Sequence, residues 1–343
     1  MIKKKNLDLF IIILLPFISW FLINKIFVDS NKKDFNEFAL GIANKIIINE
    51  LLEQKILCSS LTDIENCIKF LKKKNFKKKI LWLGNSQLNG MNQPQINSKI
   101  APYIVTEYFY NKDIGLITFA SPNMNFQEYL SVVNYFLERL DLNIILLSLV
   151  FDDLREDGIR NELVKKEINQ EINLKEKINL EERIIFFLNK KINWTQVRSQ
   201  AQGSISIFLY KLRNNIFGIT PSSVRRVIKP IYEKNFFALS KILERAESNH
   251  IKTVMYIAPI RNDVDIPYDS KEYLDFKNTL EIKAKQFSSN LHNLEDIVPN
   301  NFWGEKMATK HGVITEIDFM HFQNNGHKIL AKKIINILDD IIK

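Results

Sequence analysis

A serine behind an apolar run and an aspartate three residues before a histidine are the residues of this sequence that could do chemistry together. Ser86 ends the segment KILWLGNS (residues 79–86), and Asp318 and His321 lie near the end of the chain. An aspartate at this spacing can fold back within one turn and hold one imidazole nitrogen protonated, which leaves the other nitrogen free as a base. A serine beside such a base can attack an acyl carbon.

The segment before Ser86 predicts a buried strand that ends in a tight turn. Its apolar residues, 80–83, lie between a basic run and Gly84-Asn85, and Gly84 permits a sharp change of chain direction. Ser86 would then lie at the carboxyl end of the strand, the edge where open α/β sheets bind ligands. Its own N–H could meet an oxyanion there. The alternative interpretation is a serine that only caps the next helix.

Strand and helix patterns alternate along most of the remaining chain. Apolar runs predict strands at 114–120, 143–150, 253–258 and 291–298, and helical periodicity predicts helices at 126–140, 232–249, 274–287 and from 325. The alternation predicts a three-layer, doubly wound α/β domain over residues 79–343, with a mostly parallel, flavodoxin-like sheet. Because parallel strands end at one edge, we expect Ser86 to meet Asp318 and His321 there.

Two further regions flank or interrupt this alternation of strands and helices. Residues 157–229 predict a helical insertion, either a lid over the active-site edge or a second packed layer without a role in binding. Residues 31–78 predict a helical linker region, with apolar residues at helical spacing in two segments, 35–47 and 64–71. Cys58 and Cys67 are the only cysteines. They form a disulfide if this region is extracytoplasmic, or else remain two buried thiols.

The first 30 residues predict a membrane anchor. The apolar segment 9–23 contains no charge, follows three lysines at 3–5 and precedes no small-x-small cleavage site. This pattern favours an uncleaved signal anchor over a cleaved signal peptide, and it predicts a single-pass protein of the bacterial cytoplasmic membrane with its bulk outside. The formal net charge of +9 suits an anionic lipid surface or wall polymer. No nucleic-acid motif accompanies it, so we expect no nucleic-acid partner.

Two motifs together resemble a known superfamily. Gly84-Asn85-Ser86 is similar to the first block, Gly-Asp-Ser, of the SGNH (GDSL-like) hydrolases, and Asp318 and His321 match the last block, Asp-x-x-His. The Gly-His that often follows that block is present at Gly326-His327. The resemblance covers residues 79–343 and implies Ser86 as the nucleophile, His321 as the base, Asp318 as its orienting carboxylate, and no cofactor.

The two middle blocks depart from the superfamily pattern. Asn123 or Asn125 stands where the second block has an oxyanion glycine, and Asp152 stands where the third block has an asparagine donor. Asparagine tolerates a left-handed backbone, so its N–H could still point inward. An ionised carboxylate only accepts hydrogen bonds and would repel an oxyanion. Either the oxyanion donor comes from elsewhere, or Asp152 has another task, such as holding Arg155 or a substrate hydroxyl. The alternative is an aspartate pair that only caps the following helix.

The resemblance implies acyl chemistry on sugars. It is nearest to membrane-anchored envelope proteins that acetylate exopolysaccharides or transfer D-alanine to teichoic acids. We therefore expect an acyl esterase or acyltransferase for O-acetyl groups of envelope polysaccharide. The resemblance also implies partners: an acylated carbohydrate or acyl donor, with a membrane acyl-transfer protein as a further candidate. Arg261, on a loop at the same edge, is a candidate contact for an anion or carbohydrate. The histidines lack metal-ligand spacing, so no metal site is expected.

Two other functions stay open at this stage. The first is a catalytically inactive envelope component that keeps the fold and binds polysaccharide, or assists its export or modification; Asn123 and Asp152 favour it. The second is a basic protein that binds a membrane surface or nucleic acid, which the dispersed lysines support least.

Overall fold

The computed structural model describes residues 44–46, 50–51, 54–55, 57–58, 61–74, 76–160, 163, 208–220, 222–308 and 315–343. The chain divides into two compact units. The larger comprises Ala43–Leu174, Pro221–Lys306 and Thr315–Lys343, and the smaller comprises Met1–Ile42, Lys175–Thr220 and Met307–Ile314. Of the smaller unit the structure describes residues 208–220 and 307–308, and residues 208–216 form a helix. The larger unit carries the sheet and the candidate site.

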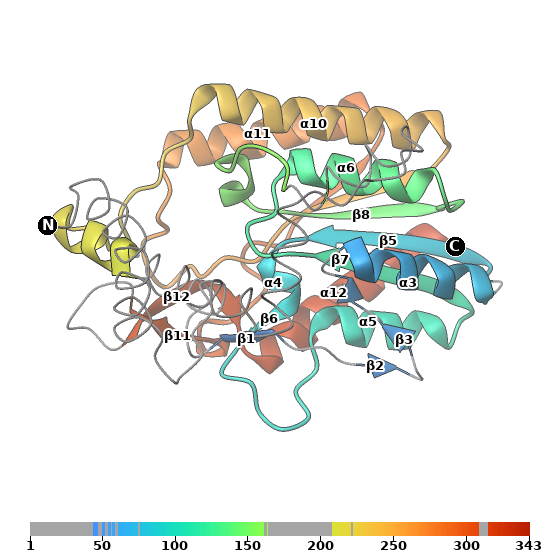
Figure 1. The fold of residues 1–343 in the computed structure, drawn as a ribbon, viewed down its shortest axis with the longest axis horizontal. Coiled ribbons are helices and arrows are strands. Elements are labelled where there is room, and N and C mark those ends of the chain that lie inside the picture. Colours follow the sequence, from blue (N-terminus) through green and yellow to red (C-terminus); the bar gives the residue numbers. More distant parts are fainter. Residues whose placement is uncertain are drawn as a thin grey trace, which may run out of the picture. The chain divides into compact units, whose positions relative to one another are not determined.

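A parallel sheet forms the centre of the larger unit. Within the described residues it has six strands in the order β10-β9-β8-β5-β7-β4. Figure 1 shows β8, β5 and β7 side by side in this sheet. All the neighbouring pairs run parallel. Strands β5, β7 and β8 are almost wholly buried, which explains their continuous apolar sequences. The bounds are β4 (Leu57–Cys58), β5 (Lys78–Gly84), β7 (Ile114–Ala120), β8 (Ile144–Leu149), β9 (Lys252–Ile257) and β10 (Asn290–Asn293).

Helices cover both faces of this sheet (Figure 1). One face packs against α3 (Leu61–Lys73), α6 (Phe126–Leu137), α10 (Lys229–Ser248) and α11 (Ser270–Gln286). The other face packs against α5 (Ala101–Tyr110) and α12 (Asn324–Ile342). Alternate residues of β5 belong to opposite cores, Leu81 and Leu83 to the first and Ile80 and Trp82 to the second. The predicted three-layer, doubly wound α/β fold is confirmed.

The strand order reverses at β5, and this sets the position of the site. The chain leaves β5 for β7 on one side and returns to β8 on the other side. The crevice outside the carboxyl ends of β5 and β8 is therefore the topological switch point, where sheets of this kind bind ligands. The short helix α4 (Ser86–Asn89) begins there, directly after β5.

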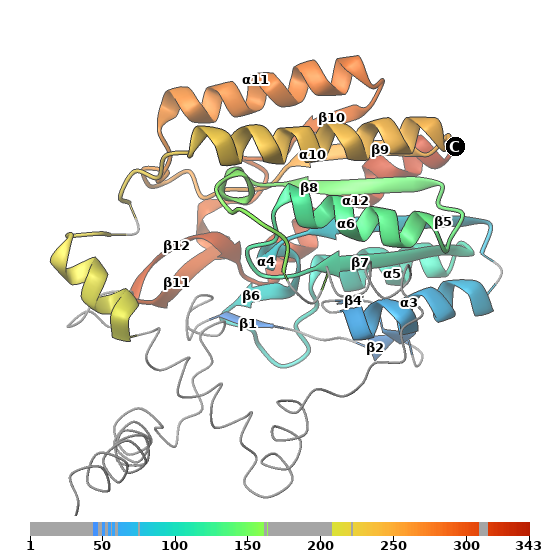
Figure 2. The same cartoon turned by 45° about the horizontal axis from the view of Figure 1, so that its top comes forward.

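A separate hairpin lies beside this edge. Strands β11 (Trp303–Met307) and β12 (Thr315–Phe322) form their own two-stranded sheet. Strand β12 contacts α4 and β6 (Gly90–Asn92), as Figure 2 shows. Strand β1 (Asn44–Ile46) pairs antiparallel with β6. The remaining short elements are β2 (Glu50–Leu51), β3 (Gln54–Lys55) and the 3-10 turns η1 (Phe151–Leu154) and η2 (Asn300–Phe302). The hairpin was not predicted from the sequence, yet it carries Asp318 and His321.

The region before residue 79 differs in part from the prediction. Helical spacing predicted a helix from residue 35 to 47, but the described residues between 44 and 58 form the short strands β1 to β4, so this prediction is wrong there. Strand β1 pairs antiparallel with β6, and tertiary pairing of this kind overrides weak helix propensity at residues 44–46. Strand β4 adds to the edge of the main sheet beside β7. The second predicted helix is present as α3. Both β4 and α3 belong to the larger unit and not to a separate linker.

The two cysteines are bonded to each other. Cys58 of β4 and Cys67 of α3 form a disulfide, with their Cα atoms 6.8 Å apart, and both side chains are fully buried. The bond joins the edge strand of the sheet to the helix that packs on it. The alternative of two free thiols is therefore wrong.

Two predictions fall on residues that are not described. The anchor at residues 1–30 lies outside the described residues, as does most of the insertion at 157–229 with its possible lid. Among the helices of the described ranges, none has both the length and the apolar character needed to cross a membrane.

Candidate active site

Ser86 opens α4 directly after the buried strand β5. A Cβ on Gly84 would lie 2.3 Å from Leu88 Cδ1 and 3.2 Å from Ser148 Cβ, so glycine lets α4 and β8 pack closely against the end of β5. Asn85 is the N-cap residue of α4, and its Oδ1 accepts a hydrogen bond from the Gln87 N–H at 3.0 Å. The cap is therefore supplied by Asn85, and the interpretation of Ser86 as the cap is wrong. The Ser86 hydroxyl is available for another contact.

The structure brings Ser86, His321 and Asp318 together across 235 residues of sequence. Ser86 Oγ lies 3.0 Å from His321 Nε2, and His321 Nδ1 lies 3.1 Å from Asp318 Oδ2. Asp318 Oδ1 accepts hydrogen bonds from the N–H groups of Met320 and His321, at 2.9 and 3.0 Å. These bonds fold the aspartate back onto the histidine, as the Asp-x-x-His spacing predicted. The carboxylate fixes the proton on Nδ1, so Nε2 can accept the proton of Ser86.

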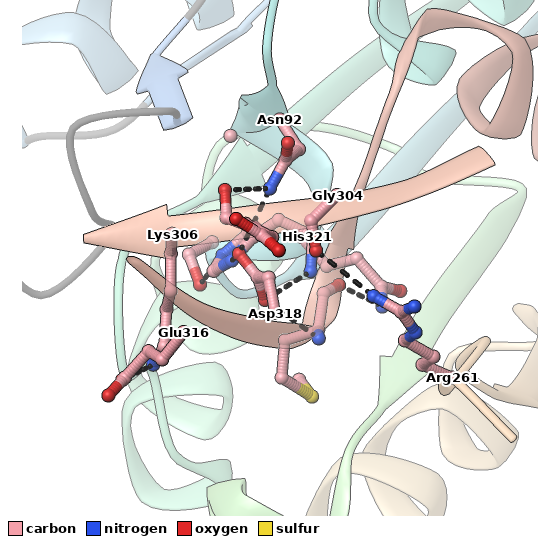
Figure 3. Close-up of polar contacts among 12 residues, drawn as sticks. Asn92, Arg261, Gly304, Lys306, Glu316, Asp318 and His321 are labelled. Carbon is pink, nitrogen blue, oxygen red and sulfur yellow. Dashed lines mark hydrogen bonds and ion pairs between the residues drawn. The ribbon is translucent and has the colours of Figure 1, made fainter. Parts of the chain in front are cut away.

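The surroundings of Asp318 keep its carboxyl group ionised. The side chain is buried, and burial by itself raises the pKa. The charge and hydrogen bond of His321, the nearby Lys306 ammonium and the backbone N–H of Met320 outweigh burial, and the net pKa lies below its usual range. Lys306 also pairs with Glu316 at 3.4 Å across the hairpin, as Figure 3 shows. An ionised Asp318 can hold and orient the imidazole of His321.

The Asp152 carboxylate pairs with arginine side chains and not with the reactive groups of the site. Its Oδ1 lies 2.9 Å from Arg155 Nη1, and its Oδ2 lies 2.6 Å from Arg225 Nη1. The Tyr268 hydroxyl also donates to Oδ2 at 3.2 Å. Of the roles considered for Asp152, the structure shows the one in which it holds Arg155. A carboxylate with these partners gives no donor to an oxyanion.

The neighbouring Asp153 is a site residue that the sequence reasoning missed. It is buried, and its Oδ1 accepts a hydrogen bond from Asn85 Nδ2 at 2.9 Å. The Tyr129 hydroxyl lies 3.3 Å from its Oδ2. Burial raises the pKa of Asp153, and the hydrogen bond from Asn85 opposes the rise. Asp153 thus fixes the residue that precedes Ser86. The available signal was an acidic residue at the end of the most apolar strand.

The two asparagines after β7 have different positions. Asn125 is the N-cap of α6 in a capping box with Glu128, and its Nδ2 donates to Gly158 O at 2.8 Å. Its polar groups are therefore used for structure. Asn123 is exposed and has a positive φ of 54°, the left-handed backbone expected for a residue in place of the glycine. Of the two, Asn123 stays the candidate for a backbone donor.

Arg261 braces the hairpin that carries Asp318. Its Nε and Nη2 pair with Asp263 at 2.6 and 3.0 Å, and its Nη1 donates to Gly304 O at 3.0 Å (Figure 3). These bonds link the loop after β9 to β11. The sequence placed Arg261 correctly at this edge, but the residues it contacts in the structure belong to the protein itself.

His327 is a structural residue beside the site. Its Nδ1 accepts a hydrogen bond from the Ala101 N–H, and its Nε2 donates to Gly90 O, both at 3.2 Å. Burial lowers its pKa to about 3, so the ring is neutral at physiological pH. It ties the first turn of α12 to α5 and to β6.

Comparisons with known proteins give fold-level likeness without a family assignment. No protein-family model matches the sequence, and no protein of curated function matches it. Several solved structures superpose on it. A GDSL-like lipase from Bacteroides thetaiotaomicron has a TM-score of 0.39 and 12% identity, over 79% of this chain and 90% of its own.

Two esterases give similar values. The psychrotrophic esterase EstA from Pseudoalteromonas sp. has a TM-score of 0.40 and 10% identity, over 78% of this chain and 99% of its own. The acetyl xylan esterase Axe2 from Geobacillus stearothermophilus has a TM-score of 0.40 and 9% identity, over 76% and 94%. At these identities the function has to be argued from the residues of this chain.

Proposed function

We propose that this protein is an SGNH-type serine acyl esterase or acyltransferase that acts on O-acyl groups, in particular O-acetyl groups, of cell-envelope polysaccharide. The observation that carries the proposal is the hydrogen-bonded series from Ser86 through His321 to Asp318. A serine, an imidazole and a buried carboxylate in this order activate the serine hydroxyl as a nucleophile. Their position at the switch point of the sheet leaves the hydroxyl at a ligand-binding edge.

The reaction follows from these contacts. Ser86 Oγ attacks the carbonyl carbon of the ester while His321 Nε2 takes the hydroxyl proton. The tetrahedral intermediate collapses, the C–O bond to the sugar breaks, and His321 returns the proton to the departing sugar oxygen. Water, or the hydroxyl of an acceptor sugar, then attacks the acyl-serine while His321 Nε2 takes its proton. The bond between the acyl carbon and Ser86 Oγ breaks, and His321 returns the proton to Oγ. Attack by water gives hydrolysis, and attack by the acceptor hydroxyl gives transfer.

Backbone N–H groups are the proposed oxyanion donors. The Ser86 N–H stands at the first position of α4, where the helix itself offers no acceptor. Asn123, with its left-handed backbone after β7, is the candidate for the second donor. Asp152 has Arg155 and Arg225 as partners, so this site lacks the side-chain donor expected at that position. We therefore expect slower chemistry than a donor side chain would give, because one such donor contributes about 10²–10³-fold.

We further propose that the protein is anchored in the bacterial cytoplasmic membrane by residues 1–30, with the larger unit outside the cytoplasm. The buried Cys58–Cys67 disulfide supports this compartment, because disulfides persist in oxidising surroundings. The charge of +9 suits an anionic surface. Protease added to intact spheroplasts should digest the chain beyond residue 34, and full protection would overturn the orientation.

A non-catalytic envelope component that binds polysaccharide is the second candidate. The specific observation in its favour is Asp152, which pairs with two arginines at the position of the missing donor. Such a protein would keep the fold and the Ser86–His321 contact without turnover.

A serine-directed fluorophosphonate probe separates the two candidates. In an active site the probe should label Ser86, as mapped by mass spectrometry, and Ser86→Ala should remove the label together with turnover of a model acetyl ester. Ser121→Ala is the matched control, because Ser121 follows β7 at the same edge but contacts Arg160 and no imidazole. Labelling should survive this change. An unlabelled wild-type protein without turnover on any acylated sugar would favour the binding component.

A further inference from the structure

The candidate nucleophile and base are carried by different sheets. Ser86 follows β5 of the six-stranded sheet, whereas His321 lies on β12 of the separate β11–β12 hairpin. Within the described residues, the strand pairings of the main sheet do not include β12. The backbone ladders therefore do not set the distance between Ser86 Oγ and His321 Nε2. A backbone hydrogen bond from the Arg261 N–H to Phe319 O, at 3.2 Å, joins β12 to the loop after β9. Buried side chains beside the site make further links.

Gln87 makes such a link from the residue next to the nucleophile. Its side chain is fully buried, and its Nε2 donates to Pro259 O at 2.7 Å and to Met320 O at 2.8 Å. Both partners are carbonyl oxygens, so the amide group must present its NH₂ to them. Met320 directly precedes His321 in β12. The Gln87 side chain thus connects the segment that carries Ser86 to the loop after β9 and to the backbone of β12 directly before His321.

Asn92 makes a second link a few residues further on. Its side chain is fully buried, and its Nδ2 donates to Glu305 O at 3.1 Å and lies 3.5 Å from Asp318 Oδ2. It therefore contacts both strands of the hairpin, as Figure 3 shows. A Cβ on Gly304 would lie 1.9 Å from Asn92 Oδ1, so the hairpin can approach this amide only with glycine there.

We propose that Gln87 and Asn92 are positioning residues for the reaction of Ser86. Two buried amides on the seven-residue segment from Ser86 to Asn92 hold β12 so that His321 stays within hydrogen-bonding distance of Ser86 and Asp318 stays aligned with His321. Neither amide touches the reacting atoms. Their effect on rate rests on the function proposed above, whereas their effect on the position of β12 does not. Misplacement of a catalytic group by about 1 Å can cost about 10²-fold in rate.

The decisive variant is Gln87→Met, which keeps the length and burial of the side chain and removes its donors. Asn89→Leu is the matched control. Asn89 is also fully buried on α4, but its single hydrogen bond, at 3.3 Å, goes to Ala120 O and not to β12. The measurements are kcat and KM on a model acetyl ester, the midpoint of unfolding, and hydrogen exchange of the Met320 and His321 amides.

Gln87→Met should lower kcat by about 10- to 100-fold with KM within about twofold of wild type. It should also speed the exchange of the Met320 and His321 amides, which donate to Asp318 Oδ1 in the folded site. Asn89→Leu should change kcat by less than about threefold and leave that exchange unaltered. Equal effects of the two variants on kcat and on exchange would overturn the proposal.

Gln87→Glu gives a second test that keeps the shape of the side chain. A buried carboxyl facing two carbonyl oxygens has a raised pKa, and only its protonated form can donate to one of them. The ratio of the kcat of Gln87→Glu to the kcat of the wild type should therefore rise as the pH falls. A constant ratio would contradict the positioning role of Gln87. Should Gln87→Met not fold, this variant and its amide exchange decide the matter.

The exchange measurement also separates this inference from the proposed function. If the wild-type protein shows no turnover but Gln87→Met still loosens β12, the enzyme proposal fails and the positioning of the hairpin stands. If the wild type is active and exchange of the β12 amides does not respond to Gln87→Met, the positioning proposal fails and the enzyme stands.

Discussion

The side-chain amide of Asn85 donates to the buried carboxylate of Asp153 at 2.9 Å, and the same side chain caps α4 through its oxygen. Asn85 therefore joins the end of β5 to η1, the 3-10 turn that follows β8, and β5 and β8 flank the switch point. The turn before Ser86 is stabilised without help from the Ser86 hydroxyl. Asn85 stabilises the turn and Ser86 is the candidate nucleophile. Substitutions at these adjacent residues should therefore have separable effects on stability and activity.

Ser86→Ala should remove probe labelling and ester turnover while the free energy of unfolding stays within about 0.5 kcal/mol of wild type. Asn85→Ala should instead lower the free energy of unfolding by about 1–3 kcal/mol, because it removes a helix cap and the donor to Oδ1 of the buried Asp153. Urea unfolding and probe labelling of both variants check the division. A loss of several kcal/mol in Ser86→Ala would contradict it.

Asp318→Asn should lower kcat by about 10³- to 10⁴-fold with little change in KM. The amide cannot stabilise the imidazolium that forms on His321, and it can leave the ring in the wrong tautomer. His321→Ala should be about as severe, and the two changes together should cost little more than one, because the groups act as a unit. Kinetics of the two single variants and the double variant test this. Multiplicative losses would show that the three groups do not cooperate.

The strands of the main sheet could be predicted because burial on both faces demands apolar runs. The predicted strand at 114–120 coincides with β7, and the one at 143–150 contains β8 (Ile144–Leu149). The β11–β12 hairpin could not be found in this way. Lys306, Glu316 and Asp318 interrupt the apolar pattern of its sequence. In the folded chain these charged side chains are held by contacts with each other and with distant parts of the chain.

The contact between Asp318 and His321 follows from local spacing, and the superfamily resemblance predicted that Ser86 meets them. The contacts of Gln87 and Asp153 were not predicted. Asp318 and His321 meet through a turn encoded by their spacing. Gln87 and Asp153 act on backbone or side chains far away in sequence, at Met320 and Asn85, so only the tertiary structure reveals them. The helix predicted at 35–47 is not formed at residues 44–46, because the pairing of β1 with β6 outweighs the local helical preference.

His327 should make the protein less stable in acid. Its folded pKa of about 3 lies below the value of about 6.5 in an unfolded chain, so the unfolded state binds the extra proton between these values. The contribution is complete above pH 6.5 and falls by about 1.4 kcal/mol per pH unit as the pH drops toward 3. His327→Gln can keep an acceptor for the Ala101 N–H and a donor for Gly90 O. Urea unfolding from pH 7 to 4 should show a shallower loss in the variant, and identical slopes would contradict the argument.

The Cys58–Cys67 disulfide should contribute about 2–3 kcal/mol, the range for a short closed loop, here with a sequence separation of 9. Thiol titration of unfolded, unreduced protein should find no free thiol, and reduction should lower the midpoint of unfolding. The change should spare probe labelling of Ser86, because β4 lies at the far edge of the sheet from β8. Two free thiols in protein isolated from the cell envelope would remove the support that the bond gives to the proposed compartment.

The sequence and the structure make opposite predictions for the activity of Asp152→Asn. A donor restored at the oxyanion position would raise hydrolysis, which is the expectation from the superfamily pattern alone. In the structure, Asp152 instead accepts from Arg155, Arg225 and Tyr268. Neutralising it leaves two guanidinium groups without their shared carboxylate, and each charge-assisted hydrogen bond contributes about 1.5–3 kcal/mol.

We therefore expect Asp152→Asn to lower both kcat and the free energy of unfolding, the latter by about 1–3 kcal/mol, because the cluster is partly exposed. Asp157→Asn is the matched control. Asp157 pairs with Lys234 at 3.1 Å on the surface, where solvent screens the pair, so its loss should leave the urea unfolding midpoint almost unchanged. A faster Asp152→Asn enzyme of unchanged stability would mean that Asp152 leaves its arginines in the reacting complex, and that the oxyanion position depends on this residue after all.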